Sequence, residues 1–318
     1  MKAIVVTAFG ALDKLQLAEV AIPEILPNQV LVRVEATSIN PIDIKTRIGQ
    51  GAANHFEVKP PFILGWDLSG QVVGCGSDVT EFMLGDHVFG CVGFPGLGQT
   101  HAEYVAVFAS HLAHKPESIS HLVCAAASMT GLTAWQALTR NAQLQQGDKV
   151  LIYGASGGVG YMAVQIAVSL GAEVVGVSSM MKMNTVLAAG AHHCLGYENT
   201  DGSLYPHDFD FILDCVGGEN TLHLLKYLKR GGTLVSLLPH QFDIGSIARQ
   251  QDKNFYFVLM QSNYLDMQQI ATLLARHIIL PKLSEIYCFS DFQQAYSLLE
   301  SHQAFGKVVL IPNDQETL

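Results

Sequence analysis

A glycine-rich turn between an apolar strand and a helix constrains the fold of this chain more than any other feature of its sequence. The run A-S-G-G-V-G at Ala155–Gly160 directly follows the apolar segment Lys149–Tyr153 and opens a helical segment that ends at Gly171. In this context Gly157 lets the backbone approach a pyrophosphate, and Gly160 lets the helix pack on the strand. The N–H groups and the positive dipole end of the helix favour phosphate binding. The first glycine of the fuller G-x-G-x-x-G fingerprint is alanine here, so a structural turn in an unrelated α/β fold is the alternative. The phosphate contacts are expected from Ser156, Gly157, Gly158 and Val159.

The end of the next expected strand indicates which dinucleotide the turn would bind. A site for NAD usually carries Asp or Glu about 20 residues after the glycines, hydrogen-bonded to the ribose 2′-hydroxyl. Here the strand at Glu173–Ser178 continues into Ser179 without an acid, and Lys182 follows. Two hydroxyls and an ammonium suit the 2′-phosphate of NADPH, which a carboxylate would repel, so NADPH is the expected cofactor. The alternative for Lys182 is a solvated lysine at the start of a helix.

Strand and helix patterns divide the chain into two parts. From Lys149 to about 277, apolar strands alternate with helices, which indicates a parallel sheet covered by helices on both faces. Residues 1 to about 115 instead carry short strands punctuated by Gly, Pro, Asn and Asp, which is typical of a compact, partly open β-barrel. The end of the chain breaks the α/β rhythm with a helix at Phe292–Glu300 and a strand at Lys307–Ile311.

Composition and charge exclude several classes of protein. The 318 residues are 49% hydrophobic and 14% charged, with a net charge of −10, so we expect no nucleic-acid partner. The longest nearly apolar stretch, Val159–Leu170, is interrupted by Tyr161 and Gln165, so we expect no membrane span. The first residues lack the pattern of a signal peptide, and none of the six cysteines forms a C-x-x-C pair. Free thiols in a reducing, cytoplasmic compartment are therefore expected.

Several short motifs occur in an order that is characteristic of one enzyme family. They are N-P-I-D-I-K at 40–45, G-W-D-L-S-G at 65–70, T-G-L-T-A-W at 130–135, the glycine turn, D-C-V-G-G at 214–218 and G-K-V-V at 306–309. With these motifs the chain resembles, end to end, the zinc-lacking branch of the medium-chain dehydrogenase/reductases. Within that branch it is most similar to the quinone oxidoreductase and enal/enone reductase group.

The resemblance implies two domains and an oligomer. A GroES-like β-barrel domain for the substrate would comprise residues 1–120 and 284–318. A Rossmann domain with a doubly wound parallel sheet would bind NADPH and comprise residues 121–283, so that the fold class is α/β. Such enzymes are usually homodimers or homotetramers. The apolar run Phe255–Val258 is a candidate edge strand of a dimer, because an exposed apolar edge is a liability, but it could equally be an interior strand.

The residues at the family's zinc positions predict an enzyme that works without zinc. By the resemblance, the places of the catalytic zinc ligands hold Asn40, Trp66 and about Met129, none of which replaces a thiolate or an imidazole. The four-cysteine structural zinc lobe is also missing, since the segment that would carry it holds a single cysteine, Cys91. Without a Lewis acid, the accessible reactions are hydride transfers to quinones or to the β-carbon of an α,β-unsaturated carbonyl.

Lys45 is the leading catalytic candidate, because it matches the N-P-x-D-x-K pattern of the enal/enone reductases. Its ammonium could donate to the developing enolate or to the nicotinamide ribose, and a solvent-facing lysine is the alternative. Asp43 could orient Lys45 or lie at the rim of the site, while capping of the following helical turn fits its position equally well. Asn40 is expected at the nicotinamide, with an Asx turn before the next proline as the alternative. Trp66 is expected to form an apolar wall for the substrate, and Asp67 to be structural.

The resemblance assigns further cofactor contacts and leaves two functions open. Thr130 would lie near the nicotinamide and Tyr197 near the adenosine ribose phosphate. The residues after the fourth and fifth strands would contact the nicotinamide ribose; they are Val216, Gly217, Leu237 and Leu238. The segments 49–60, with Phe56, and 94–99 are expected to shape the pocket for a small carbonyl or quinone substrate. The function expected first is that of an NADPH-dependent quinone oxidoreductase or enal/enone reductase. The alternative is an NADPH-binding crystallin-like or regulatory protein with little turnover.

Overall fold

The chain divides into two units in the computed structural model, which describes residues 1–55, 57–140, 144–198 and 206–312. The first unit comprises Met1–Leu132 and Gln261–Leu318, and the second comprises Thr133–Met260. The boundaries therefore differ from those expected at 120/121 and 283/284. Helix α3 (His121–Thr139) begins in the core of the first unit, where Ala125 and Ala126 pack with residues of its strands. Helix α8 (Tyr264–Ala275) contacts a strand of the same unit.

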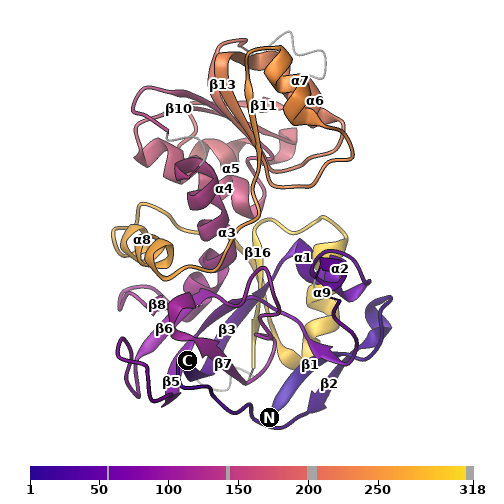
Figure 1. Ribbon diagram of the computed structural model, residues 1–318, viewed down its shortest axis with the longest axis vertical. Helices are drawn as coiled ribbons and strands as arrows, with labels where there is room; N and C mark the ends of the chain where they lie inside the picture. The colour runs from indigo at the N-terminus through magenta and orange to yellow at the C-terminus, as the bar shows by residue number, and fades with distance from the viewer. Residues whose placement is uncertain (56, 141–143, 199–205, 313–318) are drawn as a thin grey trace. The chain divides into compact units, whose positions relative to one another are not determined.

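Two sheets form the first unit, and both ends of the chain contribute strands to it. The strands are β1 (Lys2–Val6), β2 (Leu15–Glu19), β3 (Gln29–Ile39), β4 (Phe62–Ile63), β5 (Asp67–Cys75), β6 (His87–Cys91), β7 (Tyr104–Phe108), β8 (Ala113–His114), β15 (Leu283–Cys288) and β16 (Lys307–Ile311). The larger sheet has the order β15-β16-β3-β5-β6-β8, with β7 on β3, and the smaller one the order β2-β1-β4. Figure 1 shows the indigo N-terminal strands and the yellow β16 in the same unit. Strand β16 pairs antiparallel with β3, with Val308 opposite Ile39. The C-terminal strand thus pairs with the N-terminal part, as the family resemblance implied.

The core of the first unit is built from strand side chains that point to one face. Val32, Leu68, Val88 and Val105 are buried together in it, which is the environment that β-branched residues favour in strands. The remaining helices of this unit are α1 (Pro41–Arg47), α2 (Ala52–His55) and α9 (Phe292–Glu300). In the described part of the chain, no helix combines the length and the apolar character that crossing a membrane requires.

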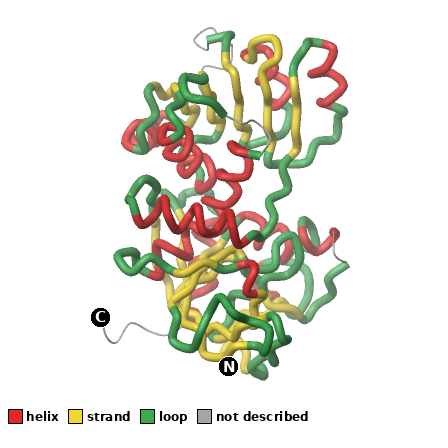
Figure 2. The backbone as a smooth tube through the Cα atoms, turned by 60° about the vertical axis from the view of Figure 1, so that its left-hand side comes forward, coloured by secondary structure: helices red, strands yellow, loops and turns green. Residues whose placement is uncertain are grey.

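The second unit contains a six-stranded sheet in which all strands run parallel. The strands are β9 (Lys149–Tyr153), β10 (Glu173–Ser178), β11 (His193–Gly196), β12 (Phe209–Asp214), β13 (Leu228–Ser236) and β14 (Asn254–Phe257). Their order is β11-β10-β9-β12-β13-β14, so the chain starts at the centre and winds outwards to both edges. The connecting helices, red in Figure 2, lie beside these yellow strands. They are α4 (Gly158–Ser169), α5 (Met183–Ala188), α6 (Asn220–Leu224) and α7 (Ile244–Gln250).

This strand order confirms the expected doubly wound α/β fold. The order reverses between β9 and β12, and ligands of such sheets bind beyond the carboxyl ends of the strands at this point. The glycine-rich turn follows β9 and therefore lies there. Strand β14, which contains Phe255–Phe257, is an edge strand of this sheet.

Candidate cofactor and substrate sites

The glycine-rich turn has a backbone that admits few side chains. Gly154 adopts a φ of +89°, in the left-handed region that favours glycine. At Gly160, a Cβ atom would stand 2.2 Å from the carbonyl oxygen of Gly154, so a side chain there would force α4 away from β9. Helix α4 begins at Gly158, and no side chain caps its N-terminus. The first N–H groups of a helix have no partner inside it, so this end presents free donors to a ligand.

Gly157 differs from these glycines, because neither its conformation nor its packing within the chain requires glycine. Its φ is −76°, which any residue adopts, and it is exposed. A Cβ atom at this position would meet no atom closer than the carbonyl oxygen of Gly154, at 3.4 Å. The missing side chain therefore leaves room for a ligand at the N-terminus of α4. The turn from Ser156 to Val159 fits the pyrophosphate of a dinucleotide in this respect.

The residues expected at the 2′-phosphate are placed differently from one another. The hydroxyl of Ser178 is buried, donates to the carbonyl oxygen of Ser179 at 3.1 Å and lies 3.6 Å from the Cys194 sulfur. Ser179 and Lys182 are half-buried, and the Lys182 N–H donates to the Ser179 carbonyl oxygen at 2.9 Å. Ser179 and Lys182 thus lie together in one turn after β10, whereas the Ser178 side chain points back into the unit. Tyr197 packs against the edge of the Tyr153 ring, with the ring centroids 5.2 Å apart.

The loop after β12 is organised by Asp214, whose role was not predicted from the sequence. The buried carboxylate of Asp214 accepts hydrogen bonds from the N–H groups of Val216 at 2.9 Å and Gly217 at 2.8 Å, and from the Thr221 hydroxyl. These bonds leave the Val216 side chain exposed. An acid at the end of a buried strand, followed by a glycine pair, was the available signal, since such residues bond backbone N–H groups two or three positions later.

The residues after β13 pack onto this loop. A Cβ atom on Gly217 would stand 2.8 Å from the Leu238 side chain, which shows that the two segments are in close contact. Leu237 and Leu238 are half-buried, and the Leu238 N–H donates to the Ser236 hydroxyl at 3.3 Å. The second unit therefore brings together the turn after β9, the loop after β12 and the segment after β13.

Asn40 and Asp67 of the first unit belong to a buried polar network. The Asn40 carboxamide donates to the Asp67 carboxylate at 2.7 Å and accepts from the ammonium of Lys307. Asn40 is 3% exposed and Asp67 is fully buried. The structural role expected for Asp67 agrees with this arrangement. Lys307, which belongs to the G-K-V-V motif, was not expected there.

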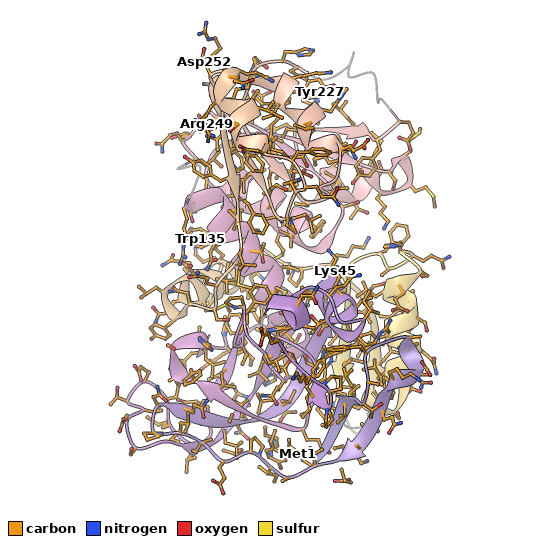
Figure 3. All side chains as sticks on the ribbon, turned by 45° about the vertical axis from the view of Figure 1, so that its right-hand side comes forward. Met1, Lys45, Trp135, Tyr227, Arg249 and Asp252 are labelled. Carbon is orange, nitrogen blue, oxygen red and sulfur yellow. The ribbon has the colours of Figure 1, made fainter. Side chains whose placement is uncertain are left out.

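Asp43 is the third residue of α1 and forms a capping box with Asn40, the residue before the helix. Its carboxylate accepts from the N–H groups of Asn40 at 2.8 Å and Gly65 at 2.9 Å. Complete burial, reinforced by the nearby Asp67 carboxylate, raises the pKa of Asp43 to about 7. These contacts are those of the capping alternative rather than of a group at the rim of a site. Lys45 is half-buried on the same helix (Figure 3), and its ammonium has no hydrogen-bond or ion-pair partner among the described residues.

Trp66 and Thr130 are both buried inside the first unit. Trp66 is fully buried, donates from its indole nitrogen to the carbonyl oxygen of Gly96 at 2.6 Å, and has the Phe94 ring at its edge. Phe94 therefore covers the tryptophan that was expected to form an apolar wall. The backbone N–H of Phe94 donates to the Ser262 hydroxyl at 3.0 Å, and this bond holds the start of the segment 94–99. The hydroxyl of Thr130 donates to the carbonyl oxygen of Ala126 at 2.9 Å, within α3. Phe56, in the other expected pocket segment, lies outside the described residues.

The donor set in this part of the first unit does not fit a zinc ion. Among the described residues, no group of three or more His, Cys, Asp or Glu side chains is placed so that it could hold a metal. Asn40 and Trp66 are bonded to protein groups, and Met129 contributes its N–H to the Asp67 carboxylate at 2.6 Å. The Lys307 ammonium lies 3.1 Å from the same carboxylate and would repel a divalent cation.

Two family models match the chain and together cover more than half of it. Residues 26–117 match the alcohol dehydrogenase GroES-like domain, and residues 189–310 match the model described as zinc-binding dehydrogenase. A relative named NAD(P)H oxidoreductase RTN4IP1, mitochondrial, from Bos taurus is 33% identical over 98% of this chain and 89% of its own length. The NADPH-dependent alkenal/one oxidoreductase, chloroplastic, of Arabidopsis thaliana is 30% identical over 98% of this chain and 80% of its own.

Solved structures agree with these relatives. The quinone oxidoreductase from Coxiella burnetii superposes with a TM-score of 0.91 at 34% identity, and the match covers 98% of this chain and 99% of that one.

The expected cytoplasmic location needs correction, because the relatives from Bos taurus, Mus musculus and Homo sapiens are named mitochondrial. Free thiols do not distinguish one reducing compartment from another, so the cysteines alone do not fix the location. From its two units, its motifs and these matches, the chain belongs to the medium-chain dehydrogenase/reductase superfamily and is an NAD(P)H oxidoreductase.

Proposed function

We propose that the protein uses NADPH to reduce a quinone or an α,β-unsaturated carbonyl without a metal. The observation that carries the proposal is the open position at Gly157, where neither φ nor packing within the chain demands glycine. The absence of a side chain there leaves room for a phosphate at the N-terminus of α4. The relatives named as an alkenal/one oxidoreductase and a quinone oxidoreductase support the acceptor class. The side chains around Asp67, which do not fit zinc, support a reaction that needs no Lewis acid.

The preference for NADPH over NADH is proposed from the end of β10. No carboxylate follows Ser178 in the place where NAD enzymes bind the ribose 2′-hydroxyl, and Ser179 and Lys182 lie together in the next turn. A phosphate at this position would gain a charge-assisted hydrogen bond from an ammonium. The buried hydroxyl of Ser178 leaves Ser179 and Lys182 as the principal proposed contacts to the phosphate.

Lys45 is proposed as the group that stabilises negative charge on the acceptor. When bound, the reduced nicotinamide supplies the hydride, so the protein contributes position and electrostatics. The ammonium of Lys45 is half-buried and has no partner among the described residues, so it can turn towards an oxygen on which charge develops. Asp43 has its carboxylate bonded to two backbone N–H groups and is proposed to hold the start of α1 in place.

The proposal is tested by following the oxidation of NADPH and NADH with a panel of quinones, enals and enones. We expect turnover with NADPH, and a KM for NADH at least tenfold higher. Lys182→Ala should raise the KM for NADPH by about tenfold to a hundredfold, because a hydrogen bond to a charged group is worth about 1.5–3 kcal/mol, and leave the KM for NADH unchanged. Equal use of both cofactors would refute the assigned preference. Tight NADPH binding without turnover on any acceptor would favour the alternative of a binding protein.

The role of Lys45 is tested with Lys45→Met, which keeps the apolar stem and removes the ammonium. We expect kcat to fall by about a hundredfold or more, as when one oxyanion donor is removed, with little change in the affinity for NADPH. Lys14→Met, at an exposed lysine paired with its neighbour Asp13, is the matched control and should leave kcat unchanged. Full activity of the Lys45→Met variant would remove Lys45 from the mechanism.

We also propose that the protein is a homodimer or homotetramer that uses the edge of β14. Tyr256 and Phe257 on this strand are 43% and 45% exposed, and Leu259 just beyond it is 42% exposed. Exposed apolar side chains on an unpaired strand edge are typical of a surface that another chain covers.

A further inference from the structure

Lys307 is a buried lysine whose ammonium is surrounded by oxygen atoms from other segments. Its side chain is 6% exposed. The ammonium donates to the carbonyl oxygen of Ile39 at 3.2 Å, to the Asn40 carboxamide oxygen and to the Asp67 carboxylate at 3.1 Å. A lysine has three N–H donors, so each donor has an acceptor here. A buried ammonium with all donors used is a cation held by a built site.

The Asp67 carboxylate is the counterion at the centre of this site. It accepts from the Lys307 ammonium, from the Asn40 carboxamide at 2.7 Å, from the Ser38 hydroxyl and from the N–H of Met129 at 2.6 Å. These donors come from β16, from the end of β3 and from α3. One ion pair therefore joins three segments that are far apart in the sequence to β5, where Asp67 lies.

The two charges also fix the orientation of the Asn40 carboxamide. Its oxygen faces the ammonium of Lys307 and its nitrogen faces the carboxylate of Asp67, so a flipped amide would place like partial charges together. The nitrogen carries two hydrogens. One bonds Asp67, and the other has no partner among the described residues. The orientation of the one remaining donor thus depends on Lys307.

We infer that the Lys307 ammonium is a built-in cation that takes the place of a metal ion in this site. Asn40 and Met129, which by resemblance occupy positions of zinc ligands in related enzymes, are both tied to the Lys307–Asp67 pair. The ammonium binds the end of β3 and the Asp67 carboxylate at the start of β5, and this carboxylate binds the Met129 N–H of α3. A bound metal would otherwise hold these segments together. Lys307 is also a positioning residue, because it sets the direction of the Asn40 amide. Only this second role rests on the proposed function.

The cation itself is tested by chemical rescue of Lys307→Ala. We expect the variant to melt at a lower temperature than wild type, and ethylammonium to restore part of the loss because it can supply the missing charge and N–H donors. Tetramethylammonium, which has the charge but no N–H, should not restore it. Wild type and Lys14→Ala, whose ion pair is exposed, should show no such dependence on the amine. An equal response of all proteins to ethylammonium, or none in Lys307→Ala, would overturn the inference.

A second comparison holds if Lys307→Ala does not fold. Lys307→Met leaves the Asp67 charge buried and unpaired, and should melt well below wild type. The double variant Lys307→Met/Asp67→Asn removes both charges at similar volume, and should recover most of the melting temperature, as is common when a whole buried ion pair is replaced. A Lys307→Met protein as stable as wild type would show that no charge needs to be balanced here.

The positioning role has a kinetic signature that a purely structural role lacks. We expect the folded double variant to keep its KM for NADPH within about threefold while kcat falls at least tenfold, because the Asn40 amide loses its fixed direction. Ethylammonium should raise kcat of Lys307→Ala in proportion to its effect on melting. Unchanged kcat in the double variant would overturn the positioning role. Absence of turnover in wild type would instead count against the proposed function, while the melting experiments would still decide on the cation.

Discussion

His101 of the first unit is a fully buried titratable group whose side chain contacts α9. Its Nδ1 atom lies 3.1 Å from the Tyr296 hydroxyl of α9, and its Nε2 atom has no hydrogen-bond partner among the described residues. Burial lowers the pKa of His101 from 6.5 to about 3, so the folded protein holds the neutral imidazole. The unfolded chain takes up a proton below about pH 6.5 and the folded one does not. The part of the unfolding free energy that depends on His101 is therefore fully present above pH 6.5 and is lost as the pH falls towards 3.

Replacement of this residue should remove a defined part of the acid sensitivity. We expect His101→Gln, which has no titratable group, to lose less stability than wild type below pH 6.5. The difference between the two unfolding free energies should change by up to about 1.4 kcal/mol per pH unit and be constant above pH 7. Urea unfolding at several pH values measures it. Other groups, such as His121, whose burial lowers its pKa to about 4, are present in both proteins and cancel. Parallel pH profiles would contradict the assignment.

The site could be predicted from the sequence where its chemistry is local. The turn from Ser156 to Gly160 carries its own signal, because a few consecutive residues must satisfy backbone and ligand together. Lys307 carries none: it opens a strand, where a lysine usually faces solvent, and its partner Asp67 is 240 residues away in the sequence. The buried hydroxyl of Ser178 was also misplaced. Strand alternation fixes the face of a side chain, but not whether a neighbour such as Cys194 covers it.

Strand and helix positions were largely predictable, since each apolar run is bounded by glycine, proline or a polar turn. The structure has β9, β10 and β16 at the residues expected from these boundaries. The two units were harder to delimit. The boundary between the units falls inside helix α3. Helix α8 comes directly after the last strand of the second unit in the sequence, but it packs on the first unit. Both assignments depend on contacts between segments distant in the sequence, which local periodicity does not report.

Two glycines of the same turn should respond to substitution in opposite ways. Gly160→Ala places a Cβ atom against backbone atoms of Gly154 and Ala155, so β9 and α4 must separate, which should cost about 1–3 kcal/mol of stability. Gly157→Ala meets no close atom of the chain and should cost no more than about 1 kcal/mol, the value for alanine at a helix N-cap. Its methyl group instead occupies the room proposed for phosphate. We therefore expect the Kd for NADPH to rise at least tenfold in Gly157→Ala.

These expectations are measured by thermal or denaturant unfolding and by calorimetric titration with NADPH. Each variant serves as the control of the other, because both add one methyl group within four residues of chain. A Gly157→Ala protein that binds NADPH as tightly as wild type would place the phosphate elsewhere. A Gly160→Ala protein of unchanged stability would show that α4 and β9 are not held together through this residue.

At the scale of the whole molecule, the edge of β14 determines how copies of the chain could associate. Backbone N–H groups alternate in direction along a strand. The Val258 N–H donates to Ser236 at the end of β13, so the Phe257 N–H points to the outer edge. Proline at this position removes an outward donor without breaking the ladder to β13, which edge strands tolerate. The side chain lost is exposed, so folding of the protomer should be little affected.

We expect wild type to be a dimer or tetramer by size-exclusion chromatography with light scattering, and Phe257→Pro to shift to a smaller species at the same concentration. Phe257→Thr, which keeps the N–H and a side chain suited to strands, is the matched control and should still associate, at a higher concentration if the aromatic ring contributes. An assembly of Phe257→Pro as stable as that of wild type would exclude backbone pairing along this edge. A loss shared equally by the proline and threonine variants would assign the contact to the ring instead of the backbone. The comparison therefore separates backbone pairing of the β14 edges of two copies from packing of their apolar side chains.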